Sequence, residues 1–234
     1  MNDHIVVRAI KRVASEVVDG LGLVGSATVH ESIGRRGYLG PEITSIQRDV
    51  RVSGSAVTVL CHPGDNLMIH AAIEVCESGD ILVVANSAPS THGSFGDLLA
   101  ASAMARGVRG LVTDAGVRDT AEIRSMGFPV WSRYVSCEGT VKAIPGSVNV
   151  PVVFGNQLVE PGDIVCADDD GVVVIPGREG VNALEASRKR LLSEGRTRAR
   201  LEAGELGVDF YGLRQTLIDV GVEYVDSVDE IGHK

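Results

Sequence analysis

Large aromatic side chains are scarce in this sequence, which has 1 Trp, 4 Tyr and 4 Phe among its 234 residues. Each such ring buries about 150–250 Å², so a core with few of them must be filled mainly by Val, Ile, Leu and Ala. Glycine is abundant instead, with 28 residues, or about 12% against a usual ~7%. This composition predicts that further apolar area is buried in a homo-oligomer, and a monomer in solution would contradict it.

Long apolar runs and an excess of basic residues are also missing. The longest apolar runs are short, such as residues 81–85 and 172–175, whereas a membrane helix needs about 20 apolar residues. Residues 1–14 lack the basic segment and apolar core of a signal peptide. The 31 acidic residues outnumber the 22 basic ones, for a net charge of −9, and nucleic-acid-binding proteins usually present a basic face. We therefore expect neither a membrane nor a nucleic acid as a partner.

The four cysteines are widely spaced and form no Cys-x-x-Cys pair; they are Cys61, Cys76, Cys137 and Cys166. Structural zinc sites and disulfide frameworks use closer and more regular spacings. The pattern therefore fits reduced thiols in a cytoplasmic protein.

The centre of the chain alternates between strand-like and helix-like segments. The expected elements are a strand at 81–85, a helix at 97–106, a strand at 110–113, a helix at 119–126 and a strand at 129–131. Such alternation predicts an α/β fold with parallel strands joined by right-handed crossovers. A polar loop over 86–96 and a turn at Ala115-Gly116 are expected to follow the first two strands.

Segments on either side of this centre give three further expectations. Apolar residues at helical spacing predict a helix over 8–20 that ends at Gly20. Residues 135–150 are expected to be rich in β-structure. Strands at 164–167 and 172–175 are expected to form a hairpin.

The C-terminal part begins with a long charged helical stretch over 177–203. A solvated helix or an oligomer contact explains its charges more simply than a polyanion site does. The tail over 205–225 has mixed periodicity and is expected to pack on a neighbour. No linker or shift in composition marks a second globular domain, so residues 1–234 are expected to form a single domain.

Polar residues that could carry chemistry gather at the carboxyl ends of the central strands. Ligands bind beyond these ends in parallel sheets, and Gly96-Asp97 and Arg118-Asp119 both follow such strands. Each pair also opens a helix, where free backbone N–H groups attract anions such as a carboxylate. The candidate site therefore consists of Asp97, Arg118, Asp119 and Glu122.

Each candidate also has a purely structural interpretation. Asp97 could simply be an N-cap, and Asp119 with Glu122 matches a capping box with Asp in place of Ser or Thr. Arg118 and Glu122 could form an i,i+4 surface pair.

The combination of the four residues favours chemistry. A carboxylate such as Asp119 suits Mg²⁺, which often binds one or two carboxylates and keeps several waters. Arg118 can hold a substrate carboxylate or a developing oxyanion, and Asp97 could orient Arg118 or a water. Together these groups could bind a 2-oxo acid and stabilise its enolate.

Other chemistries have weaker support. The sequence has no Gly-x-Ser-x-Gly elbow, no P-loop, and no Gly-x-Gly-x-x-Gly after the strand at 81–85. Schiff-base chemistry would need a buried lysine, and Lys142 is the only lysine of the central segment. His92 lies in the loop before Gly96 and could act as an acid or a base, although a lone loop histidine is more often solvated.

The residues around the candidate site resemble a known family. Asp97, within Gly96-Asp-Leu-Leu-Ala100, is followed by twenty residues, by Arg118-Asp119, by two residues and by Glu122. This arrangement resembles the RraA-like family, and more specifically the 4-hydroxy-4-methyl-2-oxoglutarate / 4-carboxy-4-hydroxy-2-oxoadipate aldolases. The similarity covers nearly the whole chain, including Pro63-Gly-Asp-Asn-Leu-Met-Ile-His70, Gly139-Thr-Val-Lys142 and the tail over 203–212.

The resemblance implies roles for the residues that match the motif. Asp119 would bind a divalent metal, Mg²⁺ or Mn²⁺, directly or through waters. Arg118 would bind the substrate and stabilise an enolate, while Asp97 would position Arg118 or a catalytic water.

Further roles are implied for the start of the helix and for two more acids. The backbone amides that would hold the pyruvyl carboxylate belong to Gly96, Asp97, Leu98 and Leu99. Glu122 is the last acid of the motif. Glu194, at the start of the C-terminal arm, resembles an acid that reaches the site of a neighbouring subunit.

The resemblance also implies a fold, an assembly and an activity. The fold would be the swivelling αββα sandwich related to phosphohistidine domains, with a helical arm over 177–234. The assembly would be a homotrimer or a hexamer. The activity would be that of a class II aldolase releasing pyruvate from a hydroxy-2-oxo acid, with oxaloacetate decarboxylation as a side activity, in bacterial catabolism of aromatic acids. The alternative is a non-catalytic regulator that binds an RNA-degradation protein, and the long tail and the intact set of site residues argue against it.

Overall fold

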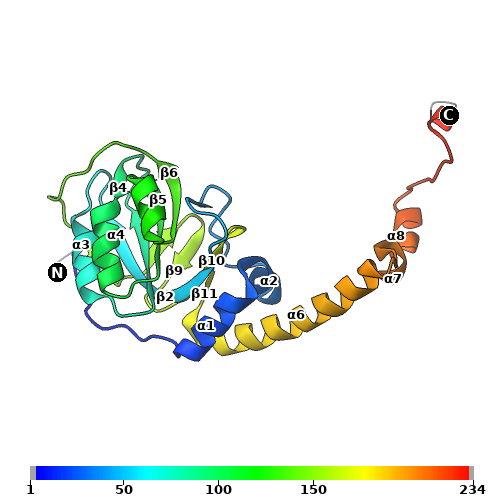
Figure 1. Ribbon diagram of the computed structural model, residues 1–234, viewed down its shortest axis with the longest axis horizontal. Coiled ribbons are helices and arrows are strands. Elements are labelled where there is room, and N and C mark those ends of the chain that lie inside the picture. Colours follow the sequence, from blue (N-terminus) through cyan, green and yellow to red (C-terminus); the bar gives the residue numbers. More distant parts are fainter. Residues whose placement is uncertain (1–3, 232–234) are drawn as a thin grey trace. The chain divides into compact units, whose positions relative to one another are not determined.

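A mixed sheet of nine strands forms the centre of the computed structural model, which describes residues 4–231 (Figure 1). The strands of the chain are β1 Thr44–Ser45, β2 Val52–Cys61, β3 Asp80–Asn86, β4 Gly93–Phe95, β5 Gly110–Val117, β6 Val130–Val135, β7 Ser147–Val148, β8 Val152–Phe154, β9 Gln157–Val159, β10 Ile164–Asp168 and β11 Gly171–Ile175. Their order in the sheet is β1-β6-β5-β3-β2-β10-β11, with β4 beside β5 and β7 beside β2, while β8 and β9 form a separate hairpin.

The predicted parallel unit is confirmed at the middle of this sheet. Strands β2, β3, β5 and β6 are mutually parallel neighbours. The predicted hairpin is also confirmed, with Ile164 of β10 opposite Ile175 of β11. The antiparallel strands β1, β7, β10 and β11 complete the sheet, so the fold is the α/β class that the resemblance implied.

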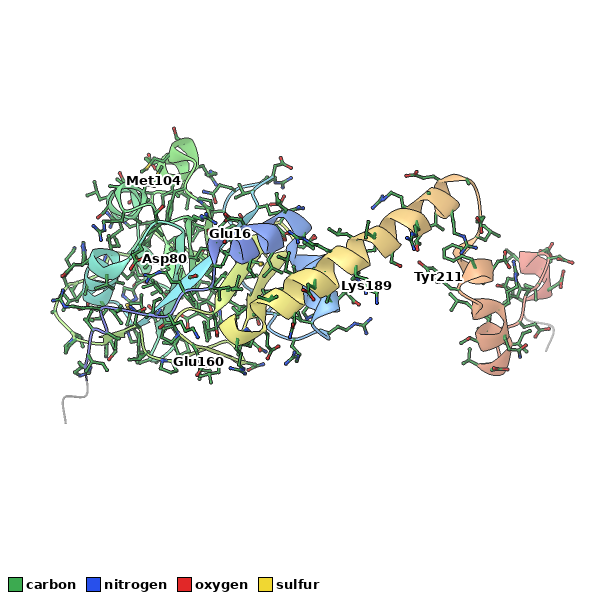
Figure 2. All side chains as sticks on the ribbon, turned by 90° about the horizontal axis from the view of Figure 1, so that it is seen from below. Glu16, Asp80, Met104, Glu160, Lys189 and Tyr211 are labelled. Atoms are coloured by element: carbon green, nitrogen blue, oxygen red, sulfur yellow. The ribbon has the colours of Figure 1, made fainter. Side chains whose placement is uncertain are left out.

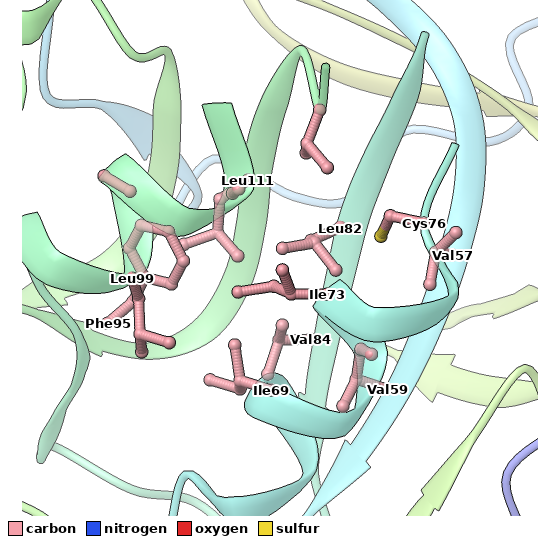
Figure 3. Packing of buried hydrophobic residues seen from close by; sticks show 14 of the residues in the cluster. Val57, Val59, Ile69, Ile73, Cys76, Leu82, Val84, Phe95, Leu99 and Leu111 are labelled. Atoms are coloured by element: carbon pink, nitrogen blue, oxygen red, sulfur yellow. The ribbon is translucent and has the colours of Figure 1, made fainter. Parts of the chain in front are cut away.

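The helices are α1 Ser15–Val24, α2 Ser26–Ser32, α3 Leu67–Val75, α4 Asp97–Ala105, α5 Thr120–Met126, α6 Gly180–Glu202, α7 Gly207–Phe210 and α8 Leu213–Asp219, with short 3-10 turns at η1 Gly177–Glu179 and η2 Val228–Glu230. Helices α3, α4 and α5 cover one face of the sheet, where aliphatic side chains such as Ile69, Ile73 and Leu99 pack on Val84 and Leu111 (Figure 3). None of the described helices is long and apolar enough to cross a bilayer.

Few aromatic rings serve this core, as the composition predicted. Phe95 and Phe128 stack with centroids 5.7 Å apart beneath α4 and α5. Trp131 and Phe154 lie in a second cluster on the opposite face of the sheet. All four rings are fully buried, so these four of the nine aromatic residues pack on the two faces of the sheet.

Two expectations about secondary structure are wrong. The first helix begins at Ser15 and runs through Gly20 to Val24. A Cβ at Gly20 would lie 2.9 Å from the Leu184 side chain, so this glycine lets α1 approach α6 closely and does not end the helix. The segment 135–150, expected to be rich in β-structure, contains only the last residue of β6, the short strand β7 and an isolated bridge at Val141 among the described residues.

A third correction concerns the strand that leads to the candidate site. Strand β5 passes through Ala115-Gly116 to Val117 with a register shift, and no turn interrupts it. A Cβ at Gly116 would lie 2.5 Å from the Thr91 carbonyl oxygen. Glycine at this position therefore lets the end of β5 pair with β4, which lies within the segment 86–96 that was expected to be a polar loop.

The contacts of the chain define two compact units, which meet between Arg190 and Leu191. The second unit contains the end of α6, then α7 and α8, and Tyr211 in this unit is labelled in Figure 2. Within it, the Arg200 guanidinium lies 4.2 Å from the centre of the Phe210 ring and pairs with Glu205. The C-terminal region is therefore helical, as expected, and it exposes many large apolar side chains, among them Leu201, Leu206, Leu213, Ile218, Val220 and Tyr224.

All four cysteines are free thiols, and only Cys137 is exposed. Burial raises the pKa of Cys61, Cys76 and Cys166 to about 12, and the thiolate is the reactive form. A thiol reagent at pH 8 is therefore expected to label one cysteine per native chain and four after unfolding. Cys137→Ser is the control, and rapid labelling of this variant in the native state would contradict the prediction.

Candidate active site

The start of α4 provides free backbone amides at the carboxyl edge of the sheet. The helix begins at Asp97 after Gly96, and no side chain caps it. Its first i→i−4 hydrogen bond runs from the Ala100 N–H to the Gly96 carbonyl at 3.0 Å. The N–H groups of the three residues before Ala100 are therefore not used by the helix and can bind an anion. They belong to Asp97, Leu98 and Leu99.

Arg118 and Asp119 come to this helix start from the end of β5. The Arg118 N–H donates to the Phe95 carbonyl at 2.9 Å, which joins the end of β5 to the residue before Gly96. The Arg118 guanidinium donates through Nε to Asp119 Oδ2 at 3.1 Å. A Cβ at Gly96 would lie 2.3 Å from the same Asp119 oxygen. The structure thus brings the two predicted pairs together, and glycine at position 96 makes their close approach possible.

The capping-box interpretation of Asp119 is wrong. Asp119 precedes α5, but its side chain makes no capping hydrogen bond. Its backbone is in the left-handed region, with φ 53°, a conformation that costs a non-glycine residue about 1–3 kcal/mol. The carboxylate is directed at Arg118 instead, so local strain places it beside the guanidinium.

A cavity of about 180 Å³ lies at this junction. Six of the predicted site residues line it: Gly96, Asp97, Leu98, Leu99, Arg118 and Asp119. Sequence reasoning did not assign a role to its other lining residues, which are Asn66, His70, Gly93, Ser94, Gly139, Thr140 and Lys142. Several of these lie in the two segments already noted for their resemblance to the aldolases, 63–70 and 139–142.

Asn66 contributes an unpaired polar atom to the cavity wall. The side chain is buried, with 7% of its surface exposed. Its Nδ2 donates to the Ser94 carbonyl at 3.0 Å, whereas Oδ1 has no hydrogen-bond partner among the described residues. A buried acceptor without a partner is uncommon, and here it is available to a bound ligand.

Besides Arg118, the basic side chains of His70 and Lys142 line the same cavity. Burial and the charge of Lys142 both lower the pKa of His70. His70 is therefore neutral at pH 7 and can accept a proton. His92, in contrast, does not line the cavity, and its ring lies near Glu138, 3.5 Å between Nε2 and Oε1.

Asp65 anchors the segment that carries Thr140 and Lys142. It is 2% exposed, and it accepts hydrogen bonds from Leu67 N at 2.7 Å, Ala143 N at 2.7 Å and Ile144 N at 2.8 Å. Burial alone would raise its pKa, but these three N–H groups hold the pKa below its usual value. One buried carboxylate therefore ties the start of α3 to residues 140–144.

Two predicted site acids lie outside this cavity. Glu122 is exposed on α5 and does not line it. The surface pair suggested for Arg118 and Glu122 is not formed, because the ion pair of Arg118 is with Asp119. Glu194 lies on the part of α6 that belongs to the second unit, whereas all residues that line the cavity come from the first.

The oxygen atoms of the cavity suit a lightly held Mg²⁺ ion. Residues 4–231 contain no cluster of three or more His, Cys, Asp or Glu side chains that could hold a metal. The cavity does offer the carboxylates of Asp97 and Asp119 and the unpaired Oδ1 of Asn66. Mg²⁺ is commonly held by one or two carboxylates and keeps several waters, so this donor set fits it better than Zn²⁺.

The fold and the cavity define a class of protein, an α/β protein with a polar cavity at the carboxyl edge of its sheet. The site combines a helix N-terminus, an arginine and two carboxylates. The Aldolase/RraA family model, described as RraA-like, matches residues 14–174. The chain belongs to this family.

Individual relatives and solved structures agree with this assignment. A Halalkalibacterium halodurans protein named "Putative 4-hydroxy-4-methyl-2-oxoglutarate aldolase" is 32% identical over 158 residues, which is 67% of this chain and 75% of that protein. Streptomyces coelicolor RraAS2, described as an unusual member of the RNase ES inhibitor RraA protein family, superposes with a TM-score of 0.73 and 31% identity, over 81% of this chain and 100% of that one. An uncharacterized Pseudomonas syringae protein gives a TM-score of 0.74 and 26% identity, over 85% and 93%.

Proposed function

We propose that this protein is a Mg²⁺- or Mn²⁺-dependent class II aldolase that cleaves 4-carboxy-4-hydroxy-2-oxoadipate or 4-hydroxy-4-methyl-2-oxoglutarate. The products would be pyruvate plus oxaloacetate, or two molecules of pyruvate. One observation carries the proposal: the N-terminus of α4 and the Arg118–Asp119 pair line one cavity. The identity with a relative named as an aldolase supports it.

Substrate binding follows from the charges of the cavity. The 1-carboxylate of a 2-oxo acid would accept hydrogen bonds from the free amides of Leu98 and Leu99. Arg118 would hold the 2-oxo oxygen, because a guanidinium suits an oxygen that becomes negative during the reaction. Asp119 would hold the metal, which polarises the 2-oxo group when bound, and Asp97 would position Arg118 or a catalytic water.

Bond cleavage then needs one proton acceptor and one electron sink. Removal of the C4 hydroxyl proton allows the C3–C4 bond to break, and C4 becomes the carbonyl carbon of the departing 2-oxo acid. The bonding electrons pass to C3 and the 2-oxo oxygen, giving a pyruvate enolate opposite Arg118. His70 lines the cavity and is neutral at pH 7, so it can accept the hydroxyl proton. Protonation of C3 releases pyruvate.

Metal-dependent pyruvate release is the test of this proposal. The purified protein is expected to release pyruvate from oxaloacetate and from 4-hydroxy-4-methyl-2-oxoglutarate, measured by coupling to lactate dehydrogenase. EDTA should stop the release and added Mg²⁺ should restore it. Free Mg²⁺ itself decarboxylates oxaloacetate, so each rate is compared with an enzyme-free reaction at the same metal concentration. Failure to exceed that background with either substrate would exclude the aldolase.

A non-catalytic regulator is the second candidate, since the similar Streptomyces protein is described as a member of an RNase ES inhibitor family. The same assay separates the two functions, because a regulator would release no pyruvate. The cytoplasmic setting in aromatic-acid catabolism and a homotrimer or hexamer belong to the aldolase proposal. The many exposed apolar side chains of the second unit support assembly, because an oligomer contact would remove them from water.

A further inference from the structure

A second and larger cavity lies on the other face of the sheet. Its volume is about 660 Å³, within the ~300–1,000 Å³ of typical small-molecule pockets. Its lining includes Asp114 of β5 and Arg133 of β6. Side chains two positions apart on a strand lie on the same face of the sheet. Asp114 and Arg133 are two positions beyond Val112 and Trp131, whose cluster lies on the face opposite α3, α4 and α5. The cavity is therefore on that face. It shares no lining residue with the candidate active site.

Arg133 brings an unpaired positive charge to this cavity. Its Nε is buried and has no hydrogen-bond partner among the described residues. No ion pair joins its guanidinium to any part of the chain from residue 4 to residue 231, and the acids that line the cavity are Asp114 and Glu42. A guanidinium offers two parallel N–H groups that match a carboxylate, so this side chain lacks the kind of partner it binds best.

Asp114 provides a fixed acceptor beside this charge. Its Oδ1 accepts from Asn86 N at 3.0 Å and from Asn86 Nδ2 at 2.8 Å, whereas Oδ2 receives only the longer 3.3 Å contact with the same N–H. Burial raises the pKa of Asp114, and the hydrogen bonds from Asn86 and the charge of Arg133 oppose that rise. A perturbed carboxyl beside a charged group in a cleft is typical of functional sites.

We propose that the Asp114–Arg133 cavity is a second binding site, which takes a small carboxylic acid that also carries a hydroxyl group. The carboxylate of the ligand pairs with Arg133, and its hydroxyl donates to Oδ2 of Asp114. This pairing gives the Arg133 guanidinium the carboxylate partner that it lacks and uses the spare acceptor of Asp114. The site does not depend on the proposed aldolase activity, because no residue of the candidate active site contributes to it.

The unpaired Nε of Arg133 also predicts how stable variants at this position will be. Arg133→Met removes a buried donor that has no partner and keeps the length of the stem, so it is expected to fold as well as the parent. Arg133→Lys keeps the charge but loses the paired N–H groups. Trp131 is the single tryptophan and lies two residues away on the same strand, so its near-UV circular dichroism reports local folding.

Isothermal titration of the full-length protein with L-malate tests the proposal, with EDTA present to exclude metal. We expect one malate per chain. Arg133→Met should weaken binding by about tenfold or more and Arg133→Lys to a lesser extent, whereas Arg124→Met, at an exposed arginine that lines neither cavity, should leave the affinity unchanged. Succinate, which lacks the hydroxyl, should bind more weakly than malate.

Three results would overturn the proposal. Wild-type protein that does not bind millimolar malate would exclude the site. Loss of binding in Arg118→Met with normal binding in Arg133→Met would place malate in the candidate active site. A change in oligomer mass in Arg133→Met, seen by light scattering together with an absence of malate binding, would show that a carboxylate of a second copy is the partner of Arg133.

Discussion

Replacing Arg118 by alanine is expected to abolish pyruvate release while leaving the fold and the oligomer intact. The guanidinium lies beside the free amides of α4 and pairs with Asp119, where it would face the developing enolate. Removal of one preorganised donor from such a position typically lowers kcat by about 10²–10³. The structural loss is small, since the Arg118 and Asp119 side chains are 46% and 30% exposed and exposed ion pairs contribute about 0–1 kcal/mol.

Steady-state kinetics and light scattering measure the two parts of this expectation. Arg118→Lys keeps the charge but loses the planar pair of N–H groups, so it should recover only part of the rate. Arg124→Ala is the matched control, because Arg124 is an exposed arginine of α5 that does not line the cavity. A near-normal kcat in Arg118→Ala would show that the reaction takes place elsewhere.

The centre of the candidate active site could be predicted from the sequence because it lies at the ends of regular strands and helices. The alternation over residues 81–131 specifies parallel strands, and parallel strands bring their carboxyl ends to one edge. For this reason the start of α4 and the Arg118–Asp119 pair could be placed together although twenty residues separate Asp97 from Arg118. The roles of these residues in catalysis remain predictions.

Irregular segments account for what the sequence did not predict. Residues 140–144 have no periodicity, and Asp65 fixes their position through single hydrogen bonds across about 80 residues of chain. Such long-range contacts leave no local pattern, so the places of Asn66 and Lys142 in the cavity could not be inferred. The register shift in β5 could not be predicted for the same reason. Glycine is required at position 116 because the backbone of Thr91 lies close to it, and not because of its neighbours in the sequence.

Asp65→Ala is expected to be strongly destabilising, because it leaves three backbone donors without an acceptor. Each buried N–H without a partner costs about 1–3 kcal/mol, so the free energy of unfolding should fall by roughly 3 kcal/mol or more. Urea unfolding followed by the fluorescence of the buried Trp131 measures the loss. Asp65→Asn keeps one carbonyl oxygen and should be less destabilising. Both variants should also raise KM, since Asn66 and Lys142 lose their common anchor.

The loss of unfolding free energy caused by Asp65→Asn should depend on pH, and the pKa of Asp65 determines in which direction. The folded pKa of Asp65 is lowered, so the ionised carboxylate stabilises the fold above its unfolded pKa of about 3.9. This contribution is lost as the pH falls through the folded pKa, and the difference between parent and Asp65→Asn should shrink there. Asp163→Asn is the control, and its effect should change with pH in the opposite direction. Burial raises the pKa of Asp163, so the ionised form of this carboxyl disfavours folding. If the Asp65→Asn difference stayed constant between pH 7 and pH values below its folded pKa, the ionised carboxylate would not be the anchor of residues 140–144.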